Sequence, residues 1–207
     1  MKSQRYGIEY LFVLGCILAV MACAGGPETT ASAPQQTGEL AGVQKLENPD
    51  MQTIQQQTPI TTAYENIFIT PVDASDQIKT DYPDALSQFQ SAVLSRVRDK
   101  GGYQNVAGSG VSPSGKSLAV ALKVLDMRIA SGAARFWGGA LVGQSFMEVY
   151  AKFTDASNGR VLHKRIIFSA ASAFGAAWSF GASDRSLPSD VGTMIGEYIV
   201  AVVPGSK

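Results

Sequence analysis

The chain has little of the side-chain chemistry that metal sites and catalytic triads use. Its 207 residues include one histidine and two cysteines. Zinc sites usually take several His or Cys ligands, so His163 alone argues against a zinc centre. The 17 basic and 17 acidic residues give no net charge, and a neutral chain lacks the basic surface that nucleic acids bind. The composition therefore predicts no metal, no cofactor and no nucleic-acid partner.

The chain also lacks the roughly 20 consecutive apolar residues that a transmembrane helix needs. Its N-terminal apolar run extends only from Tyr10 to Met21 and is interrupted by Cys16. Two basic residues precede this run, and small residues follow it up to Cys23. A basic start, an apolar middle and small residues before a cleavage point make up an export signal. We therefore expect residues 1–22 to be a signal peptide.

The four residues that end at Cys23, Val-Met-Ala-Cys, resemble the bacterial lipobox. In that motif the cysteine becomes the first residue of the mature chain and carries the lipid. The resemblance implies three acyl chains on Cys23, palmitate among them. Each buried CH2 contributes about 0.8 kcal/mol to membrane binding, so three chains anchor the protein far more firmly than one chain would. The residues that end at Cys16 resemble the motif too, but cleavage there would leave about six apolar residues, fewer than a signal normally has.

Ala24 follows the lipid-bearing cysteine, where Asp would favour the inner membrane in the best-known Gram-negative sorting scheme. We therefore expect an outer-membrane lipoprotein, on the periplasmic side rather than the cell surface. Cleavage removes two of the 17 basic and one of the 17 acidic residues, leaving 15 and 16. It also removes Cys16, and acylation of Cys23 leaves no thiol for a disulfide, so packing alone must stabilise the mature protein.

A polar stretch follows the cysteine. Residues 23–60 are rich in Gln, Thr, Gly, Pro and Ser and poor in aromatic residues, a composition that buries too little apolar surface to fold. We expect a flexible tether with an end-to-end distance of about 35 Å. Within it, Leu40, Val43 and Leu46 lie three apart, which permits a short helix that Pro49 would end.

Periodic apolar patterns begin near Thr61 and continue to about residue 204, a length that suits one compact domain. Alternation predicts a strand from Glu65 to Pro71. Apolar residues at spacings of three and four, from Leu86 to Val97, predict an amphipathic helix. Lys100-Gly101-Gly102 should close that helix with a positive charge and a left-handed cap.

The second half of the domain is predicted to consist mainly of strands. Alternation from Leu118 changes phase at Leu125, which predicts a bulged strand. Alternation also predicts strands on both sides of the Asp155–Gly159 turn, whose Asn-Gly pair is a strong hairpin signal. Pro188 and Asp190 open a closing helix that Pro204 ends. The order predicts an α+β domain with a mostly antiparallel or mixed sheet packed by two helices.

One further pattern consists of glycines and hydrophobic residues at fixed spacings: Arg135, the glycines Gly138, Gly139 and Gly143, the run Ser145–Val149, and Asp155 and Gly159 in the hairpin. With these residues, the chain from about Tyr64 to Val203 resembles an uncharacterised family of bacterial lipoproteins, domain of unknown function 4410. The resemblance implies an envelope location. It implies no assigned activity and no functional residues.

Gly110–Ser117 matches the phosphate-binding loop G-x-x-x-x-G-K-[ST] in full. That loop should follow a buried strand and open a helix, but the residues from Leu118 onward alternate as a strand does. Asp126 lies only ten residues after Lys116, too close to be the magnesium-holding Asp at the end of a second parallel strand. We therefore expect a turn between strands and no bound nucleotide, and keep a nucleotide hydrolase as a distant alternative.

Two other polar features favour structural roles. His163 lies in an alternating strand without a convincing nucleophile motif, so a surface or cross-strand position is expected rather than general-base catalysis. Four aspartates between positions 73 and 84 lack the interleaved spacing of a calcium loop. A helix start and a solvated turn explain them.

The segments 131–144 and 169–182 combine small residues with aromatic ones. One interpretation, the favoured one, is close backbone packing with core aromatics. The other is a pair of loops that docks a protein partner or the membrane, because aromatic residues and Arg are frequent at interface hot spots. The candidate interaction residues are Arg135, Phe136, Trp137, Phe174, Trp178 and Phe180.

These observations predict a lipid-anchored envelope protein that acts as a non-catalytic binding or scaffolding module. Its expected contacts are the membrane, through the N-terminal lipid, and either an envelope protein or another copy of itself. One alternative is a subunit of an outer-membrane pore or secretion assembly, which a pair of inserted hairpins would build.

Overall fold

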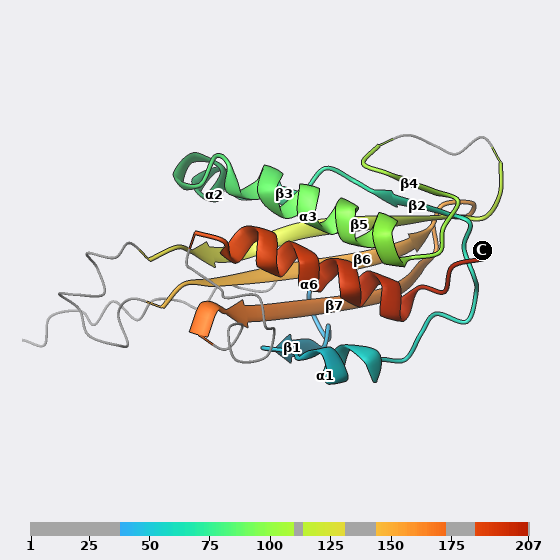
Figure 1. Ribbon diagram of the computed structural model, residues 1–207, viewed down its shortest axis with the longest axis horizontal. Helices are drawn as coiled ribbons and strands as arrows, with labels where there is room; N and C mark the ends of the chain where they lie inside the picture. The colour runs from blue at the N-terminus through green and yellow to red at the C-terminus, as the bar shows by residue number, and fades with distance from the viewer. Residues whose placement is uncertain (1–37, 110–113, 131–143, 173–184, 207) are drawn as a thin grey trace, which may run out of the picture. The chain divides into compact units, whose positions relative to one another are not determined.

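The computed structural model describes residues 38–109, 114–130, 144–172 and 185–206 (Figure 1). The chain divides into two units, Met1–Glu39 and Leu40–Lys207, and nearly all described residues belong to the second. Within the described residues, no helix is both long and apolar enough to cross a membrane.

The second unit is built on one mixed sheet in the order β1-β7-β6-β5-β2-β4, with β3 also paired to β5. Strands β5, β6 and β7 are antiparallel neighbours, whereas β1, β2, β3 and β4 pair in parallel. The strands are β1 Lys45–Glu47, β2 Asn66–Ile69, β3 Asp73–Ala74, β4 Asn105–Ala107, β5 Ser117–Arg128, β6 Phe146–Asp155 and β7 Val161–Ala170.

Helices cover one face of this sheet. Figure 1 shows α3 and α6 side by side in front of the strands, and α1 contributes Ile54 to the same apolar core. This arrangement confirms the predicted α+β domain with a mixed sheet packed by two long helices. The described helices are α1 Met51–Gln55, α2 Asp76–Asp81, α3 Ala85–Lys100 and α6 Leu187–Val202.

Several local predictions are confirmed. In α3 the predicted apolar stripe is buried except for the half-buried Leu86. The Gly101 N–H donates to the Val97 carbonyl at 2.9 Å, before Gly102 turns the chain at φ +60°. In β5 the pairing with β6 shifts between Val124 and Asp126, which makes Leu125 the extra residue of a bulge. The β6–β7 hairpin closes through Gly159 at φ +73°.

The packed unit begins near Leu40, whereas the sequence patterns placed the start of the domain near Thr61. Lys45–Glu47, part of the expected helix, is instead strand β1 on the edge of β7, and its Leu46 packs against the core. The following helix, α1, is capped because the Thr53 N–H donates to Asp50 Oδ1 at 2.7 Å. Its Ile54 is 1% exposed. The stretch expected as tether up to residue 60 therefore includes folded structure.

Candidate functional site

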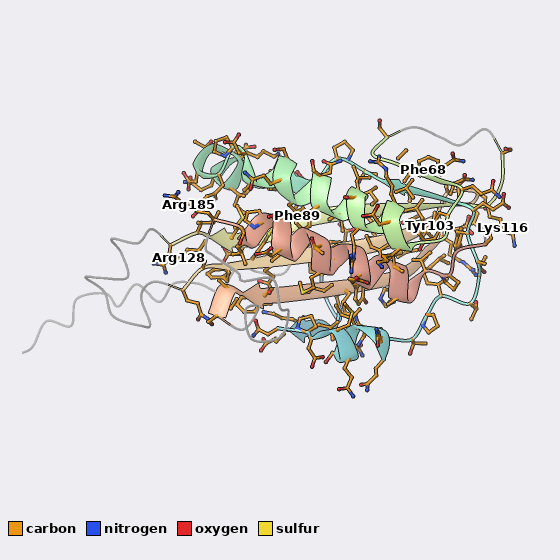
Figure 2. All side chains as sticks on the ribbon, in the orientation of Figure 1. Phe68, Phe89, Tyr103, Lys116, Arg128 and Arg185 are labelled. Carbon is orange, nitrogen blue, oxygen red and sulfur yellow. The ribbon has the colours of Figure 1, made fainter. Side chains whose placement is uncertain are left out.

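The residues predicted to act in lipid attachment and docking lie outside the described residues. Cys23 is one, and the others are Arg135, Phe136, Trp137, Phe174, Trp178 and Phe180. The described residues that flank the two aromatic segments do lie together. Arg128 at the end of β5 pairs with Phe146 of β6, which pairs with Ala170 of β7. Figure 2 shows Arg128 and Arg185 at this same end of the sheet.

A shallow cavity of about 320 Å³ lies at this end, near the first residues of α3 and α6. Hydrogen bonds connect several of its lining residues, since the Ile129 N–H donates to the Tyr82 hydroxyl at 3.3 Å and the Ala85 N–H donates to the Tyr82 carbonyl at 3.1 Å. The lining residues are Tyr82, Pro83, Asp84, Ala85, Gln88, Ile129, Arg185 and Pro188.

At the opposite end of β5, the described part of the phosphate-loop motif forms a turn into a strand. Ser117 begins β5, whereas a phosphate loop would begin a helix there. The Lys116 carbonyl accepts the N–H groups of Glu65 and Asn66 at 3.0 and 3.1 Å, as a residue entering a parallel pair does. The Asn66 side-chain amide donates to the Ser114 carbonyl at 2.9 Å and holds the turn. This local geometry agrees with the predicted turn.

A cavity of about 480 Å³ lies beside this turn. The Tyr64 hydroxyl donates to Asp155 Oδ2 at 3.1 Å, and burial raises the pKa of Tyr64 to about 12. Hydrogen bonds from Ser157 lower the pKa of Asp155. The tyrosine therefore keeps its proton and the aspartate stays ionised at neutral pH, so the hydrogen bond between them is charge-assisted. The lining residues are Thr62, Tyr64, Gly115, Lys116, Ser117, Asp155, Ala156 and Ser157.

His163 occupies the predicted cross-strand position, opposite Phe153, on the side of the sheet that faces α6. Its Nε2 lies 2.6 Å from the Tyr198 hydroxyl, which also accepts from Arg165 Nε at 3.2 Å. Burial, followed by the charge of Arg165, lowers the pKa of His163. Arg165 donates onward to the Gln44 side chain beside β1. The cluster joins β7, α6 and the segment before β1, which is a structural role.

The aspartates near α2 also have structural partners. Asp73 pairs with Lys79 and Lys123, each at 3.4 Å. Asp76 begins α2, a helix that sequence reasoning missed although Ser75 caps it by accepting the Ile78 N–H at 3.3 Å. Across the described ranges there is no group of three or more His, Cys, Asp or Glu side chains placed to bind a metal.

The fold is thus an α+β domain with a mixed sheet and helices on one face. The chain belongs to the family called domain of unknown function DUF4410, whose model matches residues 43–176. That match also agrees with the folded unit starting before residue 61. No curated protein matches the sequence.

Several solved structures align with the chain. The PelC dodecamer from Paraburkholderia phytofirmans is 17% identical, with a TM-score of 0.49 over 72% of this chain and 96% of that one. A DUF330 protein from Xanthomonas campestris is 16% identical, with a TM-score of 0.43 over 75% and 94%. A provisionally assigned lipoprotein from Caulobacter crescentus CB15 is 14% identical, with a TM-score of 0.34 over 64% and 87%. Alignments at these values carry no information about function.

Proposed function

We propose that this protein is a lipid-anchored lipoprotein of the cell envelope that acts as a non-catalytic binding or scaffolding module. The observation that carries the proposal is the Val-Met-Ala-Cys motif ending at Cys23, followed by a compact unit from Leu40. Membership of the DUF4410 family fits this proposal but assigns no activity.

Metabolic labelling with radioactive palmitate tests the anchor. We expect the wild type to incorporate label and Cys23→Ala to incorporate none, because the acyl chains need that sulfur. Cys16→Ala is the matched control, since it removes the only other cysteine and should label like the wild type. Equal labelling of wild type and Cys23→Ala would contradict the proposal, as would loss of label in Cys16→Ala alone.

The proposed location is the outer membrane, facing the periplasm. Density-gradient separation of membranes should place the protein in the outer-membrane fraction. Protease added to intact cells should leave it uncut, and protease added after the outer membrane is opened should degrade it. Recovery with the inner membrane, or degradation in intact cells, would contradict the proposed side.

The proposed binding role rests on the two aromatic segments, whose flanking residues meet at one end of the sheet. Aromatic residues and Arg dominate binding energy at protein interfaces. Crosslinking in intact cells should therefore give an adduct with a partner that weakens in Trp137→Ala and Trp178→Ala. Val161→Ala is the control, because Val161 is an exposed apolar residue, 43% accessible, at the far end of β7. Adducts that are equal in all four proteins would contradict the role of these segments.

A further inference from the structure

Hydrogen bonds at both ends of β1 attach the start of the folded unit to the edge of β7. At one end, the Ile166 N–H of β7 donates to the Gln44 carbonyl at 3.0 Å. At the other end, the Asn48 N–H donates to the Phe168 carbonyl at 2.8 Å, and Asn48 Oδ1 accepts the Ala170 N–H at 2.8 Å. The two ends of β1 are therefore held by different partners.

The Gln44 end has a second link, which runs through side chains to the helix layer. Arg165 donates to the Gln44 side-chain carbonyl, and Arg165 Nε donates to the Tyr198 hydroxyl of α6 at 3.2 Å. The same hydroxyl lies 2.6 Å from His163 Nε2. Tyr198 is buried, whereas Arg165 and His163 are half-buried. We call these four side chains the β1 latch: Gln44, Arg165, Tyr198 and His163.

The partners of the Tyr198 hydroxyl determine where its proton points. A tyrosine hydroxyl donates one proton, and its oxygen accepts, whereas an arginine side chain has only donors. The Tyr198 oxygen therefore accepts from Arg165. Among the described contacts, the acceptor for the Tyr198 proton is His163 Nε2. This arrangement requires a neutral imidazole whose own proton is on Nδ1.

Protonation of His163 removes the acceptor from the β1 latch. An imidazolium carries a proton on each ring nitrogen, so all three partners at the Tyr198 hydroxyl would then be donors. Protonation also places a second positive charge beside Arg165, the one described group whose charge acts on the pKa of His163. The rings that face His163 from β6 and α6, Phe153 and Tyr198, carry no charge. Among the described neighbours, the new charge is therefore not compensated.

We propose that the β1 latch is a pH-sensitive switch, which releases residues 40–44 when His163 is protonated. Arg165 is the long and half-exposed member of the two cations, so it moves away and loses its bond to Gln44. Asn48 keeps the other end of β1 attached, because its bonds to β7 lie outside the latch. The ion pair between Lys45 and Glu148 is partly exposed and adds little to the hold.

The released residues are those that connect the folded unit to the 39 residues before it. Five residues span at most about 17 Å when they are extended. Acid would therefore lengthen the connection between the folded unit and the N-terminus without opening the core. That this connection leads to a lipid rests on the proposed function, whereas the release itself does not.

Two amides of β7 report on the two ends of β1 separately. The Ile166 amide bonds to Gln44 at the latch end, and the Ala170 amide bonds to Asn48 at the other end. Hydrogen exchange of the mature full-length protein in detergent micelles, followed by NMR, gives the protection factor of each amide. Between pH 7.5 and pH 5.5 the protection of Ile166 should fall at least about threefold, since each unit of difference in the His163 pKa between the two states changes the release equilibrium tenfold. The protection of Ala170 should stay unchanged.

Two variants test the route through the side chains. His163→Gln offers an acceptor to the Tyr198 hydroxyl and does not titrate, so the protection of Ile166 should no longer depend on pH. Gln44→Ala removes the bond to Arg165 and keeps the backbone carbonyl, so Ile166 should already be less protected at pH 7.5 and should respond weakly to acid. Circular dichroism checks that both variants are folded.

Three results would overturn the proposal. The first is a protection factor of Ile166 that does not change with pH, and the second is an equal fall for Ile166 and Ala170, which would indicate unfolding of the whole unit. The third is a full pH response of Ile166 in His163→Gln or in Gln44→Ala. Repeating the series on the Cys23→Ala background separates this proposal from the lipid anchor, because the release does not need the lipid.

Discussion

Gly192 of α6 lies against the backbone of Phe89 in α3, so closely that a Cβ atom at position 192 would be 2.5 Å from the Phe89 carbonyl oxygen. One turn later, a Cβ at Gly196 would be 2.6 Å from the Cβ of Arg96. The two glycines therefore form the contact surface on which the long helices meet. The ion pair between Arg96 and Glu197 lies beside this contact.

Gly192→Ala should lower the free energy of unfolding by about 1–3 kcal/mol, the usual cost of inserting a carbon into a packed interior. Backbone atoms of Phe89 block the new methyl group and cannot rotate away as a side-chain end would. The helix propensity of Ala, about 1 kcal/mol better than Gly, opposes this loss without cancelling it. Urea unfolding followed by circular dichroism measures the difference.

Thr193→Ala is the matched control for this change, because Thr193 is the next residue of α6 and is only half buried. Its free energy of unfolding should stay within about 0.5 kcal/mol of the wild type. A Gly192→Ala protein as stable as Thr193→Ala would show that α3 and α6 can separate at no cost.

His163 should make the protein less stable in mild acid. Burial and the charge of Arg165 lower its pKa below the ordinary 6.5, so the unfolded chain binds the proton more readily than the folded one. The stability contribution is complete above pH 6.5 and is lost as the pH falls from there through the lowered folded-state pKa. We expect urea midpoints to drop between pH 7.5 and pH 5.5.

His163→Gln isolates this effect, because Gln can still reach the Tyr198 hydroxyl but does not titrate. Its urea midpoint should change less than the wild-type midpoint over the same pH range. His163 is the chain's only histidine, so no other histidine contributes. An equal drop in both proteins would show that groups other than His163 cause the acid sensitivity. Asp190 is not one of them, because burial raises its pKa and its protonation therefore favours the folded state.

The sequence predicted those parts of the fold that depend on local patterns. The phase change at Leu125 is visible in five residues of sequence, and the turn at Gly159 follows from its Asn-Gly pair. By contrast, Lys45–Glu47 carries no strand pattern of its own. It becomes β1 because β7 presents free backbone groups, so that the Ile166 N–H donates to the Gln44 carbonyl at 3.0 Å. Residues so far apart in the chain give no local signal.

The strand register is likewise only partly predictable, because local patterns predict the strands but not how contacts between distant residues align them. The turn at Gly159 predicts that β6 and β7 pair, but it does not predict their full register. Counted from the Thr154–Val161 pair, Lys152 would lie opposite His163, but the register shifts between Phe153 and Thr154 and places Lys152 opposite Lys164. The pairing of Asp126 with Glu148 and of Glu47 with Phe168 could not be foreseen either, because it needs the bulge in β5 and the parallel addition of β1. The predicted docking residues, from Arg135 to Phe180, stay a prediction.

Removing the N-terminal part of the packed unit should reveal where the domain begins. A chain that starts at Leu40 should keep its full stability, because the contacts of the unit begin there. A chain that starts at Thr61 loses β1 and the buried Ile54, and loss of one buried Ile side chain alone costs about 2–5 kcal/mol.

Thermal unfolding of the two truncated chains gives the comparison. The chain from Leu40 should unfold within a few degrees of the mature protein, and the shorter chain should unfold much earlier or fail to fold. Ile54→Ala in the longer chain is the control, since it should reproduce part of the loss without removing β1. Equal stability of both truncated chains would restore the boundary expected near Thr61.

Substitution should lower the free energy of unfolding at Gly115 but not at Lys116, if their turn supports the pairing of β2 with β5 and binds no phosphate. Gly115 has φ +87°, and a Cβ there would lie 2.4 Å from Glu65 Oε2, so Gly115→Ala should cost about 1–2 kcal/mol. Lys116 acts through its backbone carbonyl and its side chain is exposed, so Lys116→Ala should stay within about 0.5 kcal/mol of the wild type.

Addition of ATP with Mg²⁺ should leave the unfolding temperature of the wild type, and of the Lys116→Ala chain, unchanged. The reason is that β5 begins at Ser117, and a strand there gives no helix N-terminus to hold phosphate oxygens. A bound nucleotide would raise the unfolding temperature by mass action. If ATP raised that temperature in the wild type but not in Lys116→Ala, Gly110–Ser117 would be a nucleotide site after all.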